Sequence, residues 1–229
     1  MLKKRSDKKE LLDADDIPDK DLYQNLKELD VINALLGGYR ITFNALKKVL
    51  KKDKEHILVD IGSGGGDTLK RIYKWSQAKK IKLNLYGIDL KQTCINYSMG
   101  VNPNSAIKFI CDDYKNLYQH LPKVDIIHAS LFCHHLTDKE IIELIQFSQI
   151  NQSILIINDL ERNAFAHYAI KLLTYFFSKS YLVKNDAPLS VLRGFKIKEW
   201  KKILQQSGAK NFTINYKWAF RHEVIIYAS

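Results

Sequence analysis

The sequence predicts a doubly wound α/β fold, with helices on both sides of a mostly parallel sheet. Short apolar runs, typical of buried parallel strands, alternate along the chain with stretches of helical periodicity. The clearest run, residues 57–61, breaks into a turn at 62–66 that holds four glycines, and a helix is expected from Thr68. A strand, a tight glycine loop and a helix form the nucleotide-binding corner of such sheets. A ligand with a nucleoside part is therefore expected at this loop.

The other elements follow from periodicity and from helix-ending residues. Seven strands are expected, at residues 57–61, 83–89, 107–111, 124–130, 153–157, 212–216 and 223–227. Leu22, Leu26 and Leu29 give one apolar face to a first helix, for which Asp19 is the expected cap. Further helices are expected at 41–52, 68–77, about 96–99, 138–149, 165–177 and 196–206, the last ending at Gly208. The charged residues 1–10 are expected to form a frayed tail.

Length and composition limit the class of protein. A chain of 229 residues can form one large domain, or one domain with appendages, and bury roughly 70% of its unfolded surface. No apolar run approaches the roughly 20 residues of a membrane span, and no apolar segment that would indicate a signal peptide follows the charged N-terminus. Cys94, Cys111 and Cys133 are odd in number and lack metal-site spacing. We therefore expect a cytoplasmic protein without a disulfide framework or a zinc site.

The formal net charge of +11 raises the question of nucleic-acid binding. Only six of the 36 basic residues are arginines, the side chains favoured for contacts with phosphates and bases. A lysine-rich surface is more typical of bulk composition and solubility. The expected partner is therefore a small molecule rather than a nucleic acid.

The glycine turn narrows the choice of nucleotide. A dinucleotide fingerprint needs a third glycine where this chain has Asp67, and an acidic residue at a helix N-terminus would repel a pyrophosphate. The Gly-Lys-Ser/Thr of a P-loop is absent from the sequence. A ligand with a ribose, an adenine and a positive end, but no phosphate, fits the turn better. S-adenosylmethionine is such a ligand.

The segment from Asp60 to Gly66 resembles motif I, D/E-x-G-x-G-x-G, of the class I S-adenosylmethionine-dependent methyltransferases. Asp89 ends the next strand 23 residues after Gly66, close to the spacing expected of the acid that binds the ribose hydroxyls. After the third strand, Asp113, followed by Asp112, matches the family's acid that bonds the adenine amino group. The resemblance implies that S-adenosylmethionine is bound by Asp60, Gly62, Ser63, Gly64, Gly66, Asp89, Leu90, Asp112, Asp113, Tyr114, Ala129 and Ser130.

The same resemblance implies the arrangement of the whole chain. It predicts a Rossmann-like seven-stranded sheet that ends in a β-hairpin with an antiparallel last strand. Residues 1–54 would form an N-terminal helical lid and residues 55–229 the catalytic domain, with 163–195 inserted as a helical cap. The breaks near residues 35–40 and 192–195 resemble those of small bacterial methyltransferases related to quinone and polyketide tailoring enzymes.

Two histidines follow the fourth strand, where the family's motif IV lies. The resemblance brings His135 near the transferred methyl group, so His135 is the first candidate for a general base, with His134 and Asp159 behind it. A role as a polar turn or core residue is equally compatible with the sequence. The pair is not expected to bind a metal, because neighbouring positions on a helix do not face each other.

The acceptor is expected to contact the lid and the cap. Polar contacts are assigned to Arg40, Asp159, Glu161, Arg162 and Arg193. The aromatic residues of the cap indicate an apolar or aromatic small molecule, although they could simply pack the cap. O- or C-methylation of such an acceptor is the predicted reaction.

Two other classes of function stay open. The first is an RNA or protein methyltransferase, although the Asn/Asp-Pro-Pro-Tyr/Phe signature of many nucleic-acid amino methylating enzymes is absent. The second is a non-catalytic or dehydrogenase-like nucleotide-binding protein. A homodimer is left open as well.

Overall fold

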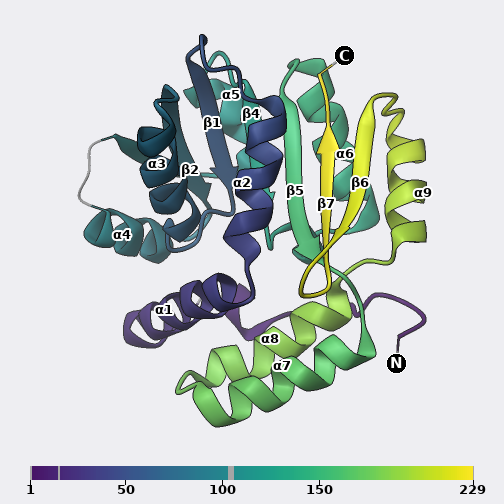
Figure 1. Cartoon of the computed structure of the whole chain (residues 1–229). Coiled ribbons are helices and arrows are strands. Elements are labelled where there is room, and N and C mark those ends of the chain that lie inside the picture. Colours follow the sequence, from purple (N-terminus) through teal and green to yellow (C-terminus); the bar gives the residue numbers. More distant parts are fainter. Residues whose placement is uncertain (1, 15, 103–105, 229) are drawn as a thin grey trace.

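A computed structural model describes residues 2–14, 16–102 and 106–228 (Figure 1). The seven strands form one sheet in the order β3-β2-β1-β4-β5-β7-β6. The strands are β1 His56–Ile61, β2 Leu83–Asp89, β3 Ile107–Cys111, β4 Ile126–Ser130, β5 Ile154–Leu160, β6 Phe212–Lys217 and β7 Arg221–Ile226. Strands β1 to β5 are parallel, and β7 is antiparallel to both β5 and β6. The predicted fold class, including the antiparallel last strand, is confirmed.

Helices cover both faces of the sheet, because the central strands β1, β4 and β5 bury residues on both sides. On one face, α2 (Gly38–Val49) and α3 (Asp67–Lys79) pack on alternate strand residues such as Leu58 and Leu85. On the other, α5 (Leu117–His120), α6 (Asp138–Ile150) and α9 (Ile197–Ser207) pack on the intervening residues, such as Val59. Helix α4 (Gln92–Val101) contacts β2 and β3. These two cores position the carboxyl ends of the parallel strands at one edge.

Three further helices lie across that edge (Figure 1). They are α1 (Asp19–Leu35), α7 (Ala164–Phe177) and α8 (Tyr181–Arg193), and α8 packs against both α1 and α7. Short 3-10 turns at Leu11–Asp13, Tyr114–Asn116 and Cys133–His135 complete the element order. The predicted cap segment, 163–195, thus folds as a helical hairpin.

The predicted N-terminal lid divides into two parts. Helix α2 belongs to the core, since Ala45 and Leu46 are fully buried against the sheet. Of the predicted lid, the described residues that precede α2 are the part that lies over the sheet edge. Helix α1 begins after Pro18 as its N-cap, and the expected cap by the Asp19 side chain does not form.

The expectation of a frayed tail is wrong for the described residues 2–10. The guanidinium of Arg5 donates to the carbonyls of Arg193, His134 and Leu136, and the amide of Ser6 donates to the carbonyl of Leu192. This segment contacts residues more than a hundred positions away, which no local pattern in the sequence reveals.

Strand β5 is longer than predicted. Asn158, Asp159 and Leu160 were expected beyond its carboxyl end, but they pair with Glu223, His222 and Arg221 of β7. Asn and Asp are depleted in strands, and here the antiparallel partner supplies the hydrogen bonds that keep the strand extended. These polar residues are consequently inside the sheet rather than on a rim loop.

Within the described part of the chain, each helix is too short or too polar to cross a membrane.

The Arg162 guanidinium joins three segments and should be important for stability. It is 1% exposed, its Nη1 donates to Gly194 O at 2.6 Å, and its Nη2 donates to the Glu199 carboxylate at 2.7 Å. We expect Arg162→Met to lower the free energy of unfolding by about 3 kcal/mol, because buried acceptors lose a charged donor. Urea denaturation would measure this. The exposed Arg40→Met should stay within about 0.5 kcal/mol of the wild type, and equal losses in the two variants would contradict the assignment.

Candidate functional site

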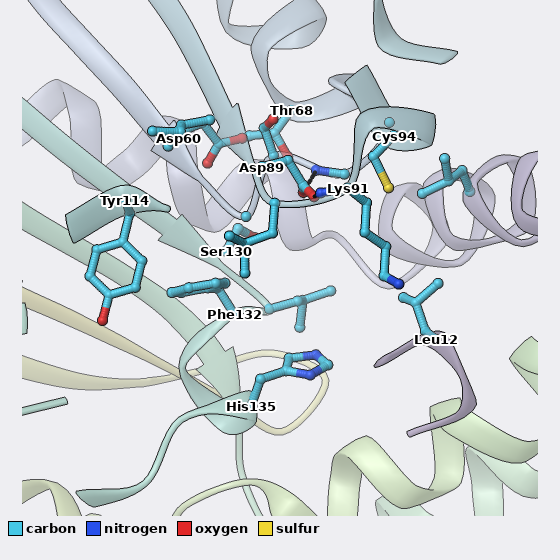
Figure 2. A pocket seen from close by; sticks show the side chains of 18 of the residues that line it. Leu12, Asp60, Thr68, Asp89, Lys91, Cys94, Tyr114, Ser130, Phe132 and His135 are labelled. Carbon is cyan, nitrogen blue, oxygen red and sulfur yellow. Dashed lines mark hydrogen bonds between the residues drawn. The ribbon is translucent and has the colours of Figure 1, made fainter. Parts of the chain in front are cut away.

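A cavity of about 380 Å³, which we call the polar cavity, opens at the carboxyl ends of β1, β2, β3 and β4 (Figure 2). Its floor is the glycine loop after β1. Its walls come from the residues after β2, β3 and β4 and from α1. The carboxyl edge beside the first strand is where ligands bind in open parallel sheets, because the chain crosses over in opposite directions there.

The glycine loop needs its glycines for conformation and for close packing. Gly62 has a φ of +62°, and a Cβ there would lie 2.2 Å from the ring of Phe132. Gly66 has a φ of +69° and packs against Phe109. These positive φ angles favour glycine strongly over other residues. The loop can therefore turn sharply from β1 into α3 and leave its backbone open to the cavity.

The Asp89 carboxylate, at the end of β2, ties this loop to its neighbour. Its Oδ2 accepts from the Gly64 amide at 2.9 Å, and its Oδ1 accepts from the Lys91 amide at 3.0 Å. Burial raises the pKa of Asp89, and the two amide bonds oppose that shift. Each oxygen keeps lone-pair capacity, because a carboxylate can accept about four hydrogen bonds. Asp89 can therefore receive two hydroxyl groups from a ligand.

Asp60 lies at the base of the polar cavity within a buried hydrogen-bond chain. Its Oδ1 lies 2.6 Å from Nδ1 of His128, and Nε2 of His128 lies 3.0 Å from Oγ1 of Thr42. Asp60 and His128 are 3% and 0% exposed. This chain fixes one oxygen of Asp60, so that its carboxylate is held at the cavity wall.

Asp67, the first residue of α3, adds a second acid to this wall. It accepts a hydrogen bond from the Tyr39 hydroxyl. Burial raises the pKa of Asp67 to about 6; the Tyr39 hydrogen bond opposes the shift and the negative charges of Asp30 and Asp60 reinforce it. At neutral pH the carboxylate is therefore ionised at a cost in stability, which is characteristic of ligand sites.

The opposite end of the polar cavity is formed after β3. Asp112 accepts from Nε2 of His120 at 2.6 Å and from Nδ2 of Asn116 at 2.9 Å, and its pKa is lowered chiefly by the His120 bond. Asp113 caps the following turn by accepting from the Lys115 amide. The Tyr114 ring stands edge-on to Phe132, with centroids 5.6 Å apart. This end offers carboxylates beside two aromatic rings.

One buried polar atom in the glycine loop has no partner. Ser63 is 6% exposed, and among the described residues its hydroxyl makes no hydrogen bond. Ser63 also lines the polar cavity. An unpaired buried hydroxyl costs free energy unless a ligand or water satisfies it. The loop is thus chemically incomplete as it stands.

A second cavity, of about 530 Å³, lies beneath α1, α7 and α8, and we call it the apolar cavity. Its walls are mainly Leu29, Ile32 and Leu36 of the α1 region, Phe165, Ala169, Ile170 and Leu173 of α7, and Tyr216, Trp218 and Phe220 near the β6–β7 turn. It shares Leu12, Leu29, Leu131 and His135 with the polar cavity. The two cavities are therefore adjacent.

His134 and His135 lie where the cavities adjoin. Nδ1 of His134 lies 2.7 Å from Oδ1 of Asp159, whose pKa is lowered by the charge and hydrogen bond of His134, against the effect of its burial. Nδ1 of His135 lies 3.1 Å from Oδ1 of Asp13. Both Nε2 atoms lie near the buried carboxylate of Glu10, at 3.6 and 3.7 Å. In each histidine an acid lies at Nδ1, which favours the neutral tautomer that carries its proton on Nδ1 and its lone pair on Nε2.

The prediction that these two rings do not face each other is wrong. The histidines lie in a 3-10 turn rather than an α-helix, and their ring centroids are 4.4 Å apart. With Glu10 they bring three potential metal-ligating atoms within 4.8 Å of one another. The Arg193 guanidinium, 3.9 Å from Glu10, opposes a bound cation. That the reaction needs no metal remains a prediction.

The structure brings together most of the predicted cofactor residues. All but Gly66 and Ala129 line the polar cavity; Gly66 packs under the loop and Ala129 is fully buried in the sheet. His135 lines both cavities and His134 the apolar cavity. Their roles with a ligand stay predictions.

None of the five predicted acceptor contacts lines either cavity. Arg40 is exposed on α2, and Glu161 is paired with Lys196 at 3.2 Å. Asp159 and Arg162 are buried in the contacts described above. Arg193 donates to the carbonyls of His134, His135 and Lys8. The two buried arginines and Asp159 therefore fix the backbone and the His134 ring.

Most aromatic side chains of the predicted cap do not line the cavity where the acceptor is expected. Among the aromatic side chains of α7, only Phe165 lines the apolar cavity, and even Phe165 is 71% exposed. Four others are 62–82% exposed and line neither cavity: Tyr168, Tyr175, Phe176 and Phe177. The helical period explains this, because Phe165, Ala169 and Leu173 recur every four residues on one face. The remaining aromatic walls come from the β6–β7 turn, and the run of Tyr216, Trp218 and Phe220 was their only signal in the sequence.

No protein-family model matches the chain, and no curated protein sequence matches it significantly. Solved structures do resemble it. The plantazolicin methyltransferase BpumL in complex with SAH has a TM-score of 0.58 and 18% identity, over 91% of this chain and 99% of that one. BamL, another plantazolicin methyltransferase, solved with SAH and a triazolic desmethylPZN analogue, gives 0.60 and 18%, over 91% and 86%.

The CMeT domain of the citrinin polyketide synthase is similar as well, with a TM-score of 0.57 and 13% identity, over 80% of this chain and 49% of that chain. Identities this low establish the fold and not the reaction. The chain therefore has the fold of the S-adenosylmethionine-dependent methyltransferases, in agreement with the sequence motifs.

The raised pKa of Asp67 predicts how stability depends on pH. A folded-state pKa of about 6, against 3.8 as the ordinary value, means that stability falls as pH rises from about 4 to about 6. We expect Asp67→Asn, which keeps an acceptor for Tyr39, to be more stable than the wild type at pH 7.5 by about 1–2 kcal/mol, after allowance for solvent screening. The difference should vanish near pH 4.

Urea denaturation at both pH values would measure this effect. The exposed Asp53→Asn serves as the control and should match the wild type at both. An Asp67→Asn protein less stable than the wild type at pH 7.5 would contradict the assigned charge state.

Proposed function

We propose that this protein transfers a methyl group from S-adenosylmethionine to a small, apolar or aromatic acceptor. The observation that carries the proposal is the pair of adjoining cavities. One is lined by acids at the carboxyl ends of the strands, the other by apolar side chains, and His135 lines both. Such a pair suits one polar and one apolar reactant that meet at a single point.

The polar cavity fits the chemical groups of this cofactor. Asp89 would accept the two ribose hydroxyls, and the unpaired Ser63 hydroxyl adds a further polar contact. The Tyr114 and Phe132 rings with Asp112 and Asp113 would hold the adenine. Asp60 and Asp67 would face the positively charged methionine end, since opposite charges attract strongly in a partly buried site.

Apolar walls and a volume of about 530 Å³ favour a drug-sized acceptor over a macromolecule. The BamL structure holds a triazolic desmethylPZN analogue, which is compatible with a heteroaromatic ligand in this fold. An RNA acceptor is less favoured, because the helices α1, α7 and α8 cover the cavity. A peptide-derived acceptor that inserts only a few aromatic rings into the apolar cavity is also consistent with the proposal.

The residues at the junction would position the acceptor and take its proton. S-adenosylmethionine supplies a methyl group already activated on a sulfonium. A new bond from the acceptor atom to the methyl carbon forms as the carbon–sulfur bond breaks, and that electron pair stays on sulfur. Where the acceptor atom is a hydroxyl, Nε2 of His135 would receive the proton, and Asp13 at Nδ1 would stabilise the resulting imidazolium.

The cytoplasmic location also belongs to the proposal. The three cysteines are unpaired, and two of them are buried, which suits a reducing compartment. Burial raises the pKa of Cys133, so this thiol is poorly reactive. A homodimer stays a prediction.

Binding of the cofactor product tests the first half of the proposal. We expect isothermal titration calorimetry to show micromolar binding of S-adenosylhomocysteine, at least ten-fold tighter than that of NAD. Asp89→Ala should weaken it at least ten-fold, because two hydrogen bonds to an ionised acceptor are lost. Asp53→Ala, on an exposed loop, is the matched control and should bind as the wild type does. Preferential binding of NAD would support the dehydrogenase-like alternative instead.

The role of His135 can be separated from general effects by the choice of acceptor. We expect His135→Ala to lower kcat for a phenolic acceptor about 100-fold, within the range typical of a general base. Thiophenol, ionised at pH 8, needs no base and should lose less than ten-fold. Methyl transfer from radiolabelled S-adenosylmethionine would measure both, after phenols and quinols are screened. Equal losses for the two acceptors would assign His135 a positioning role only.

Chelation tests the expectation that no metal takes part. Treatment with EDTA should leave methyl transfer within two-fold, because the Glu10 carboxylate already receives the Ser190 hydroxyl and lies near Arg193. A loss that zinc or magnesium restores would instead assign a metal to Glu10, His134 and His135.

A further inference from the structure

Arg221, the first residue of β7, is buried without a partner for its charge. Its side chain is 2% exposed, and the residue lines the apolar cavity. Among the residues that the structure describes, its Nε and Nη1 atoms have no hydrogen-bond partner and no ion pair includes it. A buried, unpaired guanidinium is costly, because it loses its hydration and gains no compensating contact.

The other two buried arginines show what a structural role looks like in this protein. Arg162 donates to Glu199 and to two carbonyls, and Arg193 donates to three carbonyls. Arg221 has no equivalent set among the described residues. The acid that acts most strongly on its charge, Asp159, is already bonded to His134. The protein therefore does not supply the anion that Arg221 needs.

Arg221 nonetheless stays charged at neutral pH. Burial lowers its pKa to about 10, against the opposing influence of Asp159 and Tyr39. At pH 7 a group with this pKa is protonated in more than about 99% of the molecules, because each pH unit changes the ratio of protonated to deprotonated forms ten-fold. The apolar cavity therefore contains a full positive charge in a low-dielectric setting.

The local backbone is shaped to bring this side chain to the cavity. Ala219 and Phe220, directly before Arg221, have φ angles of +57° and +55°, which are rare for residues with a Cβ. Gly38 leaves space for two side chains, since a Cβ there would lie 1.8 Å from Oδ1 of Asn33 and 2.7 Å from Nη1 of Arg221. Strained backbone that lines a cavity is characteristic of functional sites.

We propose that Arg221 binds an anionic group of the methyl acceptor, a carboxylate, within the apolar cavity. A guanidinium and a carboxylate match in geometry and form two parallel hydrogen bonds, which are stronger away from water. The proposed acceptor is then an apolar or aromatic acid, rather than any apolar molecule. This inference rests on the proposed function for the identity of the bound molecule as acceptor.

The methionine carboxylate of the cofactor is the other source of the same chemical group. Arg221 lines the apolar cavity and is absent from the lining of the polar cavity, where the cofactor residues gather. The acceptor is therefore the favoured source, and the test must separate the two.

The test compares a charged and a neutral probe of the same shape. Naphthalene-2-carboxylate and naphthalene-2-carboxamide would be titrated calorimetrically into the wild type and Arg221→Met, each saturated with S-adenosylhomocysteine. We expect the wild type to bind the carboxylate at least ten-fold tighter than the carboxamide. In Arg221→Met this preference should fall below two-fold, with the carboxamide affinity and the binding of S-adenosylhomocysteine unchanged.

Thermal unfolding distinguishes ligand binding from a structural role. Arg221→Met should keep or raise the midpoint, because an unpaired buried charge is removed, whereas Arg162→Met should lower it. Arg221→Lys, which keeps the charge but loses the fork, should retain part of the carboxylate preference.

Several results would overturn the proposal. The first is that the wild type binds the two probes equally or binds neither. The second is that the preference for the carboxylate survives in Arg221→Met. The third is that the unfolding midpoint of Arg221→Met falls as far as that of Arg162→Met. Weakened binding of S-adenosylhomocysteine by Arg221→Met would assign the arginine to the cofactor carboxylate. Failure of the wild type to bind S-adenosylhomocysteine would overturn the proposed function together with this inference, whereas the other results overturn this inference alone.

Discussion

The hydrogen bond from the Gly64 amide to the Asp89 carboxylate is the contact on which the site depends. It joins the loop after β1 to the end of β2, and the parallel register of these strands brings the two residues together. Because Asp89 is half-buried, a carboxylate without these amide donors would be costly there. The same bond orients the carboxylate toward the polar cavity. One interaction thus sets both the shape of the loop and the position of the main hydrogen-bond acceptor.

The sequence predicted this part of the molecule well because its determinants are local. The glycines from Gly62 to Gly66 and the acid at the end of β2 lie within about thirty residues, and parallel strands bring their carboxyl ends to one edge whatever the details of the helices. The residues that escaped prediction are held by distant partners. Glu10 lies in a segment expected to fray, and Arg221 lies 183 positions after Gly38, whose missing side chain makes room for it.

The predicted acceptor contacts failed for a related reason. Charge alone marked Arg162 and Arg193 as candidates, but a charged side chain in a sequence carries no sign of whether the fold supplies its partner. Both arginines are satisfied by backbone carbonyls and acids, whereas Arg221, which no motif in the sequence singles out, is not. A buried charge therefore indicates a ligand site when it lacks a partner, and only the three-dimensional structure shows whether a partner is present.

The two cavities present different charged groups, and this arrangement suits the proposed reaction. Asp60, Asp67 and Asp89 line the polar cavity. The apolar cavity has the acids Glu10 and Asp186, which already accept from Ser190 and from the Leu11 and Leu12 amides, and the unpaired Arg221. A cationic sulfonium would face the acids of the polar cavity, and an anionic acceptor would meet Arg221. Methyl transfer removes the positive charge of the sulfonium, which weakens attraction to the acidic wall and favours release of the product. The stability lost by holding Asp67 ionised and Arg221 unpaired is, on this view, recovered only when both ligands are bound.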